Sequence, residues 1–206
     1  MNPIRINRMA FSPVIWAVLS KEITPYILRN DEELVAQADY KTGSLGDEDC
    51  AELRGIVRHF KPKVIAEVGT YIGRSTRAMA DGMSGGVIYT CDASNDIKLP
   101  DLYGGAVEQF PKQTSTQMFT TLVERGVQVD LFYLDGRLAG ADTDLMANLS
   151  RDAVIVLDDF EGIEKGVANA SLLLSTQFAG HILVYPRPSR KTALLLPQSA
   201  VQFVAQ

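Results

Sequence analysis

Apolar residues along the chain fall into short runs that are separated by segments with helical spacing. One helix is predicted over residues 47–61, because its apolar residues recur at intervals of three and four. They are Leu53, Ile56, Val57 and Phe60. Acidic residues open this segment and basic residues close it before Pro62, an arrangement that complements the helix dipole.

The part of the chain that follows alternates between buried strands and helices. Almost uninterrupted apolar runs, which predict strands, lie at residues 64–68, 87–91, 129–134 and 153–157, with a weaker one at 106–110. Helical segments are expected at residues 73–80, 115–124 and 163–176. Runs without polar alternation indicate strands covered on both faces, and their alternation with helices predicts a parallel sheet.

The last two apolar runs, residues 182–185 and 193–196, flank a proline-containing turn and are interpreted as a hairpin. The expected fold class is therefore α/β, a doubly wound, mostly parallel seven-stranded sheet with a C-terminal antiparallel hairpin, in a domain of residues 44–206. Residues 1–43 are expected to form an N-terminal extension or lid, with one short helix at 31–38.

The N-terminal extension contains an apolar stretch, residues 9–19, that superficially resembles a signal peptide. Pro13 interrupts it, no small-residue cleavage site follows, and it is too short to span a bilayer. We therefore expect a cytoplasmic protein without membrane contact. The run from Ile15 to Leu19 is too apolar to stay in water, so we expect it to pack on the core or across a homodimer interface.

Composition narrows the class of protein further. The chain has 206 residues, of which 46% are hydrophobic and 22% charged, as expected for one domain with a substantial core. A formal charge of −5 argues against a nucleic-acid partner, and the basic group Arg187, Arg190 and Lys191 lies in a Pro-rich turn. Cys50 and Cys91 lack metal-ligand spacing and are expected to be buried free thiols.

Glycine and acidic residues follow the predicted strands, at the sheet edge where open α/β proteins bind ligands. The run from Glu67 to Ser75 contains two glycines, which permit a sharp turn and a close approach of the backbone to a ligand. The next strand ends in Asp92, the usual place for a carboxylate that holds ribose hydroxyls. Gly69 and Gly73 lie four positions apart, unlike the G-x-G-x-x-G spacing of dinucleotide-binding folds.

The run Glu67-x-Gly69-x-Tyr71-x-Gly73-x-Ser75 resembles the first motif of class I S-adenosylmethionine (SAM)-dependent methyltransferases. It is most similar to the catechol-type, cation-dependent O-methyltransferases and the related small family 24 methyltransferases. The likeness covers residues 44–196 and includes the closing hairpin. It implies SAM as the cofactor.

The resemblance also assigns roles to residues around the glycine turn. Gly69 and Tyr71, in the turn that Gly73 closes, would line the cofactor, and Ser75 with the loop amides would meet its methionine carboxylate. Glu67 would orient the loop or the cofactor's amino group. The remaining implied contacts are Asp92 with the ribose hydroxyls, Ser115 near the adenine and Asp135 facing the sulfonium.

Two later strands also end in carboxylates, Asp135 in one case and Asp158 with Asp159 in the other. In the catechol-type family, acids at these positions hold a divalent cation, and three oxygen donors suit Mg²⁺. Such an ion would lower the pKa of a substrate hydroxyl. The resemblance therefore makes Asp135 and Asp158 the catalytic candidates, and all three acids the candidate metal ligands.

Departures from the family leave the metal open. The segment Asp135–Gly140 lacks the histidine that relatives often carry there, and Leu138 replaces a lysine that some of them use as a base. The acids at the end of the later strand would alternatively cap the helix that follows. Of three carboxylates so close together, one would be protonated unless a cation intervened, and that cation is either a divalent ion or the guanidinium of Arg137.

The expected function is transfer of a methyl group from SAM to a small-molecule acceptor, at oxygen. One alternative is a domain that holds SAM without catalysing a reaction, which the missing base favours. The other is a nucleotide-dependent oxidoreductase on a similar sheet, which the spacing of Gly69 and Gly73 disfavours.

Overall fold

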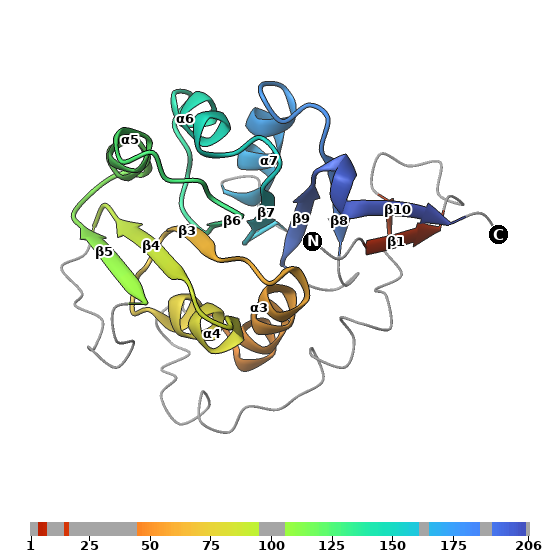
Figure 1. Ribbon diagram of the computed structural model, residues 1–206, viewed down its shortest axis with the longest axis horizontal. Helices are drawn as coiled ribbons and strands as arrows, with labels where there is room; N and C mark the ends of the chain where they lie inside the picture. The colour runs from red at the N-terminus through yellow and green to blue at the C-terminus, as the bar shows by residue number, and fades with distance from the viewer. Residues whose placement is uncertain are drawn as a thin grey trace.

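The computed structural model describes residues 4–7, 15–16, 45–94, 106–160, 165–185 and 191–204. Its elements (Figure 1) are β1 (Ile4–Asn7), β2 (Ile15–Trp16), α3 (Asp47–Phe60), β3 (Val64–Val68), α4 (Arg74–Gly82), β4 (Val87–Asp92), β5 (Val107–Pro111), α5 (Ser115–Glu124), β6 (Leu131–Leu134), α6 (Asp142–Leu149), β7 (Val154–Leu157), α7 (Gly166–Leu174), β8 (Ile182–Tyr185), β9 (Ala193–Leu196), the 3-10 helix η3 (Gln198–Ala200) and β10 (Val201–Val204).

The main sheet has eight strands in the order β2-β8-β9-β7-β6-β3-β4-β5. The neighbours from β7 to β5 are all parallel, whereas β9 runs antiparallel to both β7 and β8. The seven strands from β8 to β5 confirm the predicted mostly parallel sheet and its C-terminal hairpin. The eighth strand is β2, whose two residues pair in parallel with Val184 and Tyr185 at the edge of the sheet.

The N-terminal segment enters the fold at a second place. Strand β1 pairs in parallel with β10 to form a separate two-stranded sheet, from Ile4 opposite Val201 to Asn7 opposite Val204 (Figure 1). Neither strand was predicted, because polar residues interrupt both segments, IRIN and VQFV, whereas the predicted four-residue strands are apolar runs. The helix expected at residues 31–38 lies outside the described residues.

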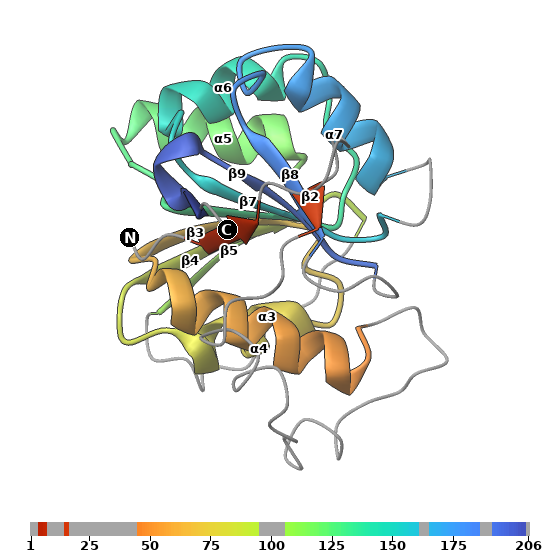
Figure 2. The same ribbon diagram turned by 90° about the vertical axis from the view of Figure 1, so that its right-hand side faces the viewer.

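Helices cover both faces of the main sheet. Figure 2 shows α3 and α4 on one face and α5, α6 and α7 on the other. Consecutive strand residues therefore enter opposite cores: Ile65 packs in the cluster with α3 and α4, whereas Ala66 packs in the cluster with the other three helices. This two-sided burial explains why the strands are apolar without alternation.

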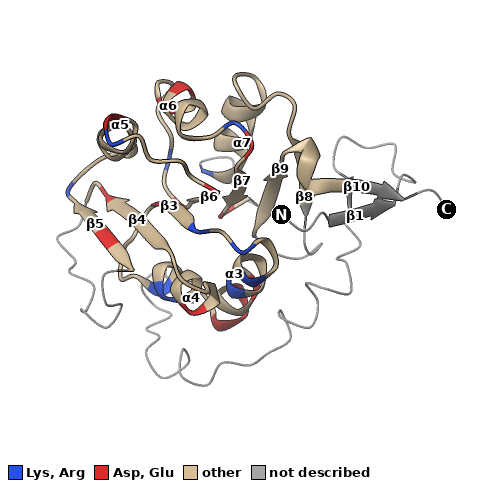
Figure 3. Cartoon of the chain, viewed as in Figure 1, with Lys and Arg blue, Asp and Glu red and all other residues tan. Residues whose placement is uncertain are grey.

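Helix α3 follows its prediction closely. Figure 3 shows both acidic and basic residues on α3. Its first turn is acidic, its last turn carries Arg58 and His59, and the chain leaves it through Lys61 in a left-handed conformation with φ 52°. The two cysteines are buried free thiols, as predicted. Within the described ranges, no helix is long and apolar enough to span a bilayer.

Candidate functional site

The turn after β3 is built by backbone conformations that favour glycine. Gly69 has φ +98° and Gly73 has φ +81°. A Cβ on Gly69 would lie 3.1 Å from the carbonyl carbon of Asp135 and 3.2 Å from the nitrogen of Gly136. The loops after β3 and β6 are thus packed backbone against backbone, and a side chain at position 69 would force them apart.

Glu67 lies fully buried beneath this turn and accepts hydrogen bonds from the hydroxyls of Ser75 and Thr76. Burial raises the pKa of Glu67 to about 7, although the hydrogen bonds from these hydroxyls oppose the shift. The carboxyl group therefore ties β3 to the first turn of α4 and orients the loop between them. The resemblance implied that Ser75 contacts the cofactor. In the structure its hydroxyl instead donates to the buried carboxyl group of Glu67.

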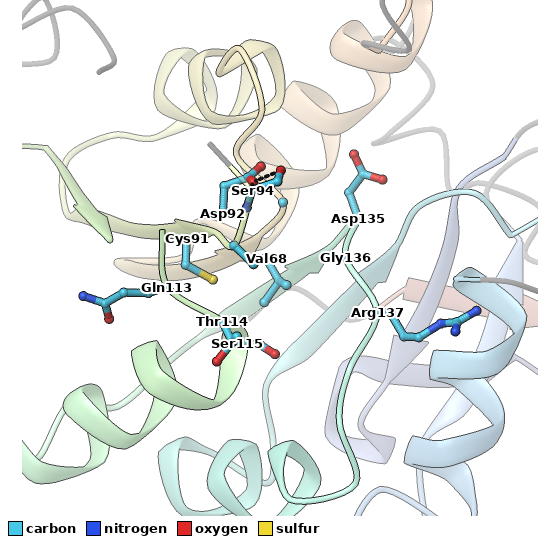
Figure 4. A pocket seen from close by; sticks show the side chains of 12 residues that line it. Val68, Cys91, Asp92, Ser94, Gln113, Thr114, Ser115, Asp135, Gly136 and Arg137 are labelled. Carbon is cyan, nitrogen blue, oxygen red and sulfur yellow. Dashed lines mark hydrogen bonds between the residues drawn. The ribbon is translucent and has the colours of Figure 1, made fainter. Parts of the chain in front are cut away.

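Asp92, at the end of β4, is held by its neighbours. Its Oδ2 accepts from the backbone nitrogen of Tyr71 at 2.8 Å, and its Oδ1 accepts from the nitrogen and hydroxyl of Ser94 at 2.9 and 2.7 Å (Figure 4). Tyr71 itself has φ +44° and lies against the ends of β4 and β5, beside Phe110. Asp92 thus fixes the glycine turn relative to β4.

A cavity of about 300 Å³ opens at the carboxyl ends of β3, β4 and β6 (Figure 4). The chain places β4 and β5 on one side of β3 and then crosses to β6 on the other, so the cavity lies where the strand order reverses. Its lining residues are Val68, Gly69, Cys91, Asp92, Ala93, Ser94, Gln113, Thr114, Ser115, Asp135, Gly136 and Arg137.

Half of the eight predicted cofactor residues line this cavity: Gly69, Asp92, Ser115 and Asp135. The other four do not line it: Glu67 lies in β3, Tyr71 and Gly73 in the turn, and Ser75 at the start of α4. Sequence reasoning missed Gln113 and Thr114. A signal was present, because Thr114 and Gln117 form a capping box that marks the first turn of α5.

Asp142 was also missed, although it joins three parts of the site. This buried carboxylate accepts from the hydroxyls of Ser115 and Thr116, each at 2.6 Å, and from the nitrogen of Ala139 at 2.8 Å. The start of α5 is thereby fixed to the loop after β6. Nothing local distinguishes Asp142 from an ordinary acid in the first turn of a helix.

Helix α7 holds the same loop from the other side. The buried Asn169 donates to the carbonyl of Gly136 at 2.9 Å and accepts from the nitrogen of Leu138 at 3.0 Å. One turn earlier, Lys165 places its Nζ 3.0 Å from Asp135 Oδ1 and 2.9 Å from Asp159 Oδ2. Both contacts tie α7 to the edge of the cavity.

The three predicted metal ligands have different surroundings. Asp158 is buried and accepts from the hydroxyl of Tyr133 at 3.0 Å. Burial, together with the nearby charge of Asp135, raises the pKa of Asp158 to about 7. Burial also raises the pKa of Asp135, against the opposing effect of Lys165. Asp159 adopts φ +50° and turns its carboxylate to the ammonium of Lys165.

This arrangement does not fit a divalent ion. Asp158 accepts a hydrogen bond from Tyr133. The ammonium of Lys165 lies between Asp135 and Asp159. Across the described part of the chain, no three acidic, histidine or cysteine side chains are placed to share an ion. Arg137, considered above as the compensating cation, points away from Asp135 (Figure 4), and Lys165 takes that position.

No family model matches the chain, and no curated protein matches its sequence. Its fold does match solved structures. An O-methyltransferase from Bacillus cereus, in complex with S-adenosylhomocysteine (SAH), is 19% identical with a TM-score of 0.58, over 84% of this chain and 93% of that one. An O-methyltransferase from Streptomyces achromogenes involved in tomaymycin synthesis, in complex with SAM, is 20% identical with a TM-score of 0.57, over 85% and 95%. The chain therefore has the class I methyltransferase fold.

Proposed function

We propose that this protein binds SAM in the cavity at the carboxyl ends of β3, β4 and β6 and transfers its methyl group to an oxygen of a small molecule. One observation carries the proposal. The cavity that Gly69, Asp92 and Asp135 line lies at the strand-order reversal of a fold shared with O-methyltransferases that were solved with SAM or SAH.

The lining residues suit the different parts of SAM. Asp92 and Ser94 supply oxygens for the ribose hydroxyls, and Ser115 at the start of α5 is the candidate neighbour of the adenine. Asp135 offers negative charge to a sulfonium. Gly69 lets the loop after β3 pack closely against the loop after β6, because a side chain there would meet that loop.

When bound, SAM supplies an electrophilic methyl carbon. In the transfer, the acceptor oxygen bonds to this carbon, the carbon–sulfur bond breaks with its electron pair left on sulfur, and the hydroxyl proton leaves. Asp135 is our candidate acceptor for that proton, because it lines the cavity and burial raises its pKa. Neither histidine is placed for this role: His59 is buried against Phe60, and His181 lies 3.2 Å from the carbonyl of Ala153. The chain's main contribution is to hold the reactants in line.

We include in the proposal a cytoplasmic location, no nucleic-acid partner, and a domain of residues 44–206 with the preceding extension packed beside it. The two buried free thiols support the cytoplasmic location, and the net charge of −5 argues against a nucleic-acid partner. The pairing of β1 with β10 and of β2 with β8 supports an extension packed beside the domain. A homodimer stays a prediction, and size-exclusion chromatography with light scattering tests it.

Calorimetric titration with SAH tests the proposal. We expect micromolar binding, about −8 kcal/mol. Asp92→Ala should weaken it by roughly 1–3 kcal/mol, because hydrogen bonds to a charged group are lost. The matched control is Asp130→Ala. Asp130 also accepts two backbone hydrogen bonds, from Lys63 and Val64, but at the opposite end of β3.

The control variant should bind SAH as the wild type does. Equal losses in the two variants would show a general effect on the fold, and absence of binding in the wild type would refute the proposal.

Parallel titration with nicotinamide dinucleotides tests the oxidoreductase alternative. Turnover with methyl-labelled SAM, over a panel of catechols and hydroxylated acids, separates an enzyme from a domain that only binds.

A further inference from the structure

A lysine of the chain itself contacts Asp135, one of the residues that line the cavity. Lys165, immediately before α7, places its ammonium within 3.0 Å of carboxylates from two different loops, Asp135 after β6 and Asp159 after β7. Its side chain is 42% exposed, so the ammonium can be reached from solvent. A second lysine, Lys191, lies farther away, 3.9 Å from the other oxygen of Asp159.

Packing of the backbone holds this bridge in place. A Cβ on Gly166 would lie 2.5 Å from the carbonyl oxygen of Asp158 and 2.7 Å from the Cα of Phe160. The start of α7 is therefore in direct contact with the turn that carries Asp159. Asn169, four residues after Lys165, bonds to the loop that carries Asp135. The backbone of Lys165 is thus held close to the two loops that carry its carboxylate partners.

We infer that Lys165 is the resident cation of this site, and that its ammonium occupies the position between Asp135 and Asp159 that a divalent ion would otherwise take. A divalent ion could bind both carboxylates only by displacing the ammonium. The geometry of the inference comes from the two contacts of Lys165 alone. Its consequence, that methyl transfer at this cavity needs no metal, rests on the proposed function.

The replacement changes how an acceptor is positioned. An ammonium donates three hydrogen bonds, and in the described part of the chain two of them go to Asp135 and Asp159. One N–H is left for a single oxygen of the acceptor, whereas a hydrated divalent ion can bind two oxygens at once. The class of acceptor that fits presents one hydroxyl or carboxylate oxygen to Lys165 and needs no second oxygen beside it.

A Mn²⁺ titration tests the inference without any methyl acceptor. Binding is detected as a loss of the electron paramagnetic resonance signal of the free ion. We expect no binding by the wild type at millimolar Mn²⁺. Lys165→Ala should bind Mn²⁺ at least about tenfold more tightly, because Asp135 and Asp159 lose their cation and carboxylates suit this ion. Lys191→Ala is the matched control, since it removes a lysine near Asp159 and leaves the bridge intact.

Two results would overturn the inference. One is stoichiometric Mn²⁺ binding by the wild type that Asp159→Ala abolishes, because the ion would then displace the lysine. The other is a Lys165→Ala variant that gains no affinity for Mn²⁺. Titration of the same samples with SAH in the presence of a chelator keeps the proposals apart, since failure to bind SAH contradicts the proposed function and leaves the Mn²⁺ result unaffected.

Discussion

At the scale of single residues, the buried Glu67 makes the stability of the protein depend on pH. Burial raises the pKa of its carboxyl group from the ordinary 4.5 to about 7 in the folded protein. The folded state therefore holds a proton that the unfolded chain releases between these two values. The resulting stabilisation is complete below pH 4.5 and is lost as the pH rises through about 7.

We expect Glu67→Gln to flatten this dependence. The free energy of unfolding of the wild type, relative to that of the variant, should fall by about 1 kcal/mol per pH unit between roughly pH 5 and pH 7. Urea unfolding at several pH values measures it. Glu124→Gln removes an exposed carboxylate of the same size and is the control. Parallel profiles for the wild type and Glu67→Gln would contradict the expectation.

Residues at the end of a strand or directly after it could be assigned from the sequence, because their place at the sheet edge depends only on chain order. Gly69, Asp92 and Asp135 line the cavity for this reason. Side-chain direction could not be predicted in the same way, as the hydrogen bond of Ser75 to Glu67 illustrates. Lys165 was missed because it lies 30 residues from Asp135 and no local pattern joins the two.

Among the elements, α7 sets the shape of the cavity's edge through Asn169. Replacing Asn169 by alanine removes two hydrogen bonds and leaves the buried amide of Leu138 and carbonyl of Gly136 without their partner. We expect a loss of roughly 2–4 kcal/mol in the free energy of unfolding. Because Gly136 lines the cavity, affinity for SAH should fall as well.

Urea unfolding and calorimetry measure these two effects of Asn169→Ala. The control is Asn148→Ala, which removes an exposed asparagine from the neighbouring helix α6. An Asn169→Ala variant as stable as this control would show that water replaces both hydrogen bonds, and that the loop after β6 does not depend on α7.

The elements were predictable to the extent that they have apolar periodicity and clear ends. Helix α3 has both, with an apolar stripe, acidic residues at its start and Pro62 beyond its end. Helix α6 has neither. It is short, its first residue is the buried Asp142, and its fully buried apolar residues are Met146 and Leu149. Its position is set by hydrogen bonds from α5, which the sequence does not display.

For the whole molecule, the N-terminal segment contributes backbone pairing at two separate edges. Deleting residues 1–20 removes β1 and β2 and exposes β10 and the edge strand β8. We expect the free energy of unfolding to fall by at least about 1 kcal/mol, and the melting temperature therefore by at least roughly 2–4 °C in a protein of this size. Newly exposed edges should also promote aggregation.

Differential scanning calorimetry and light scattering measure the effects of this deletion. Deleting only residues 1–3 keeps both strands and is the control. If the variant with the longer deletion had the same melting temperature and the same light scattering as the control, the two strand pairs would contribute nothing to stability.

The pairing of β1 with β10 also bears on the order of events during translation. Ile4 leaves the ribosome early, but Val201, its partner, is synthesised after every strand of the main sheet. The parallel strands from β3 to β7 are synthesised well before β10, whereas β1 has no partner strand until β10 is made. Contacts between such distant segments form slowly. Docking of β1 should therefore follow assembly of the parallel strands, and until then this strand is available to chaperones and proteases.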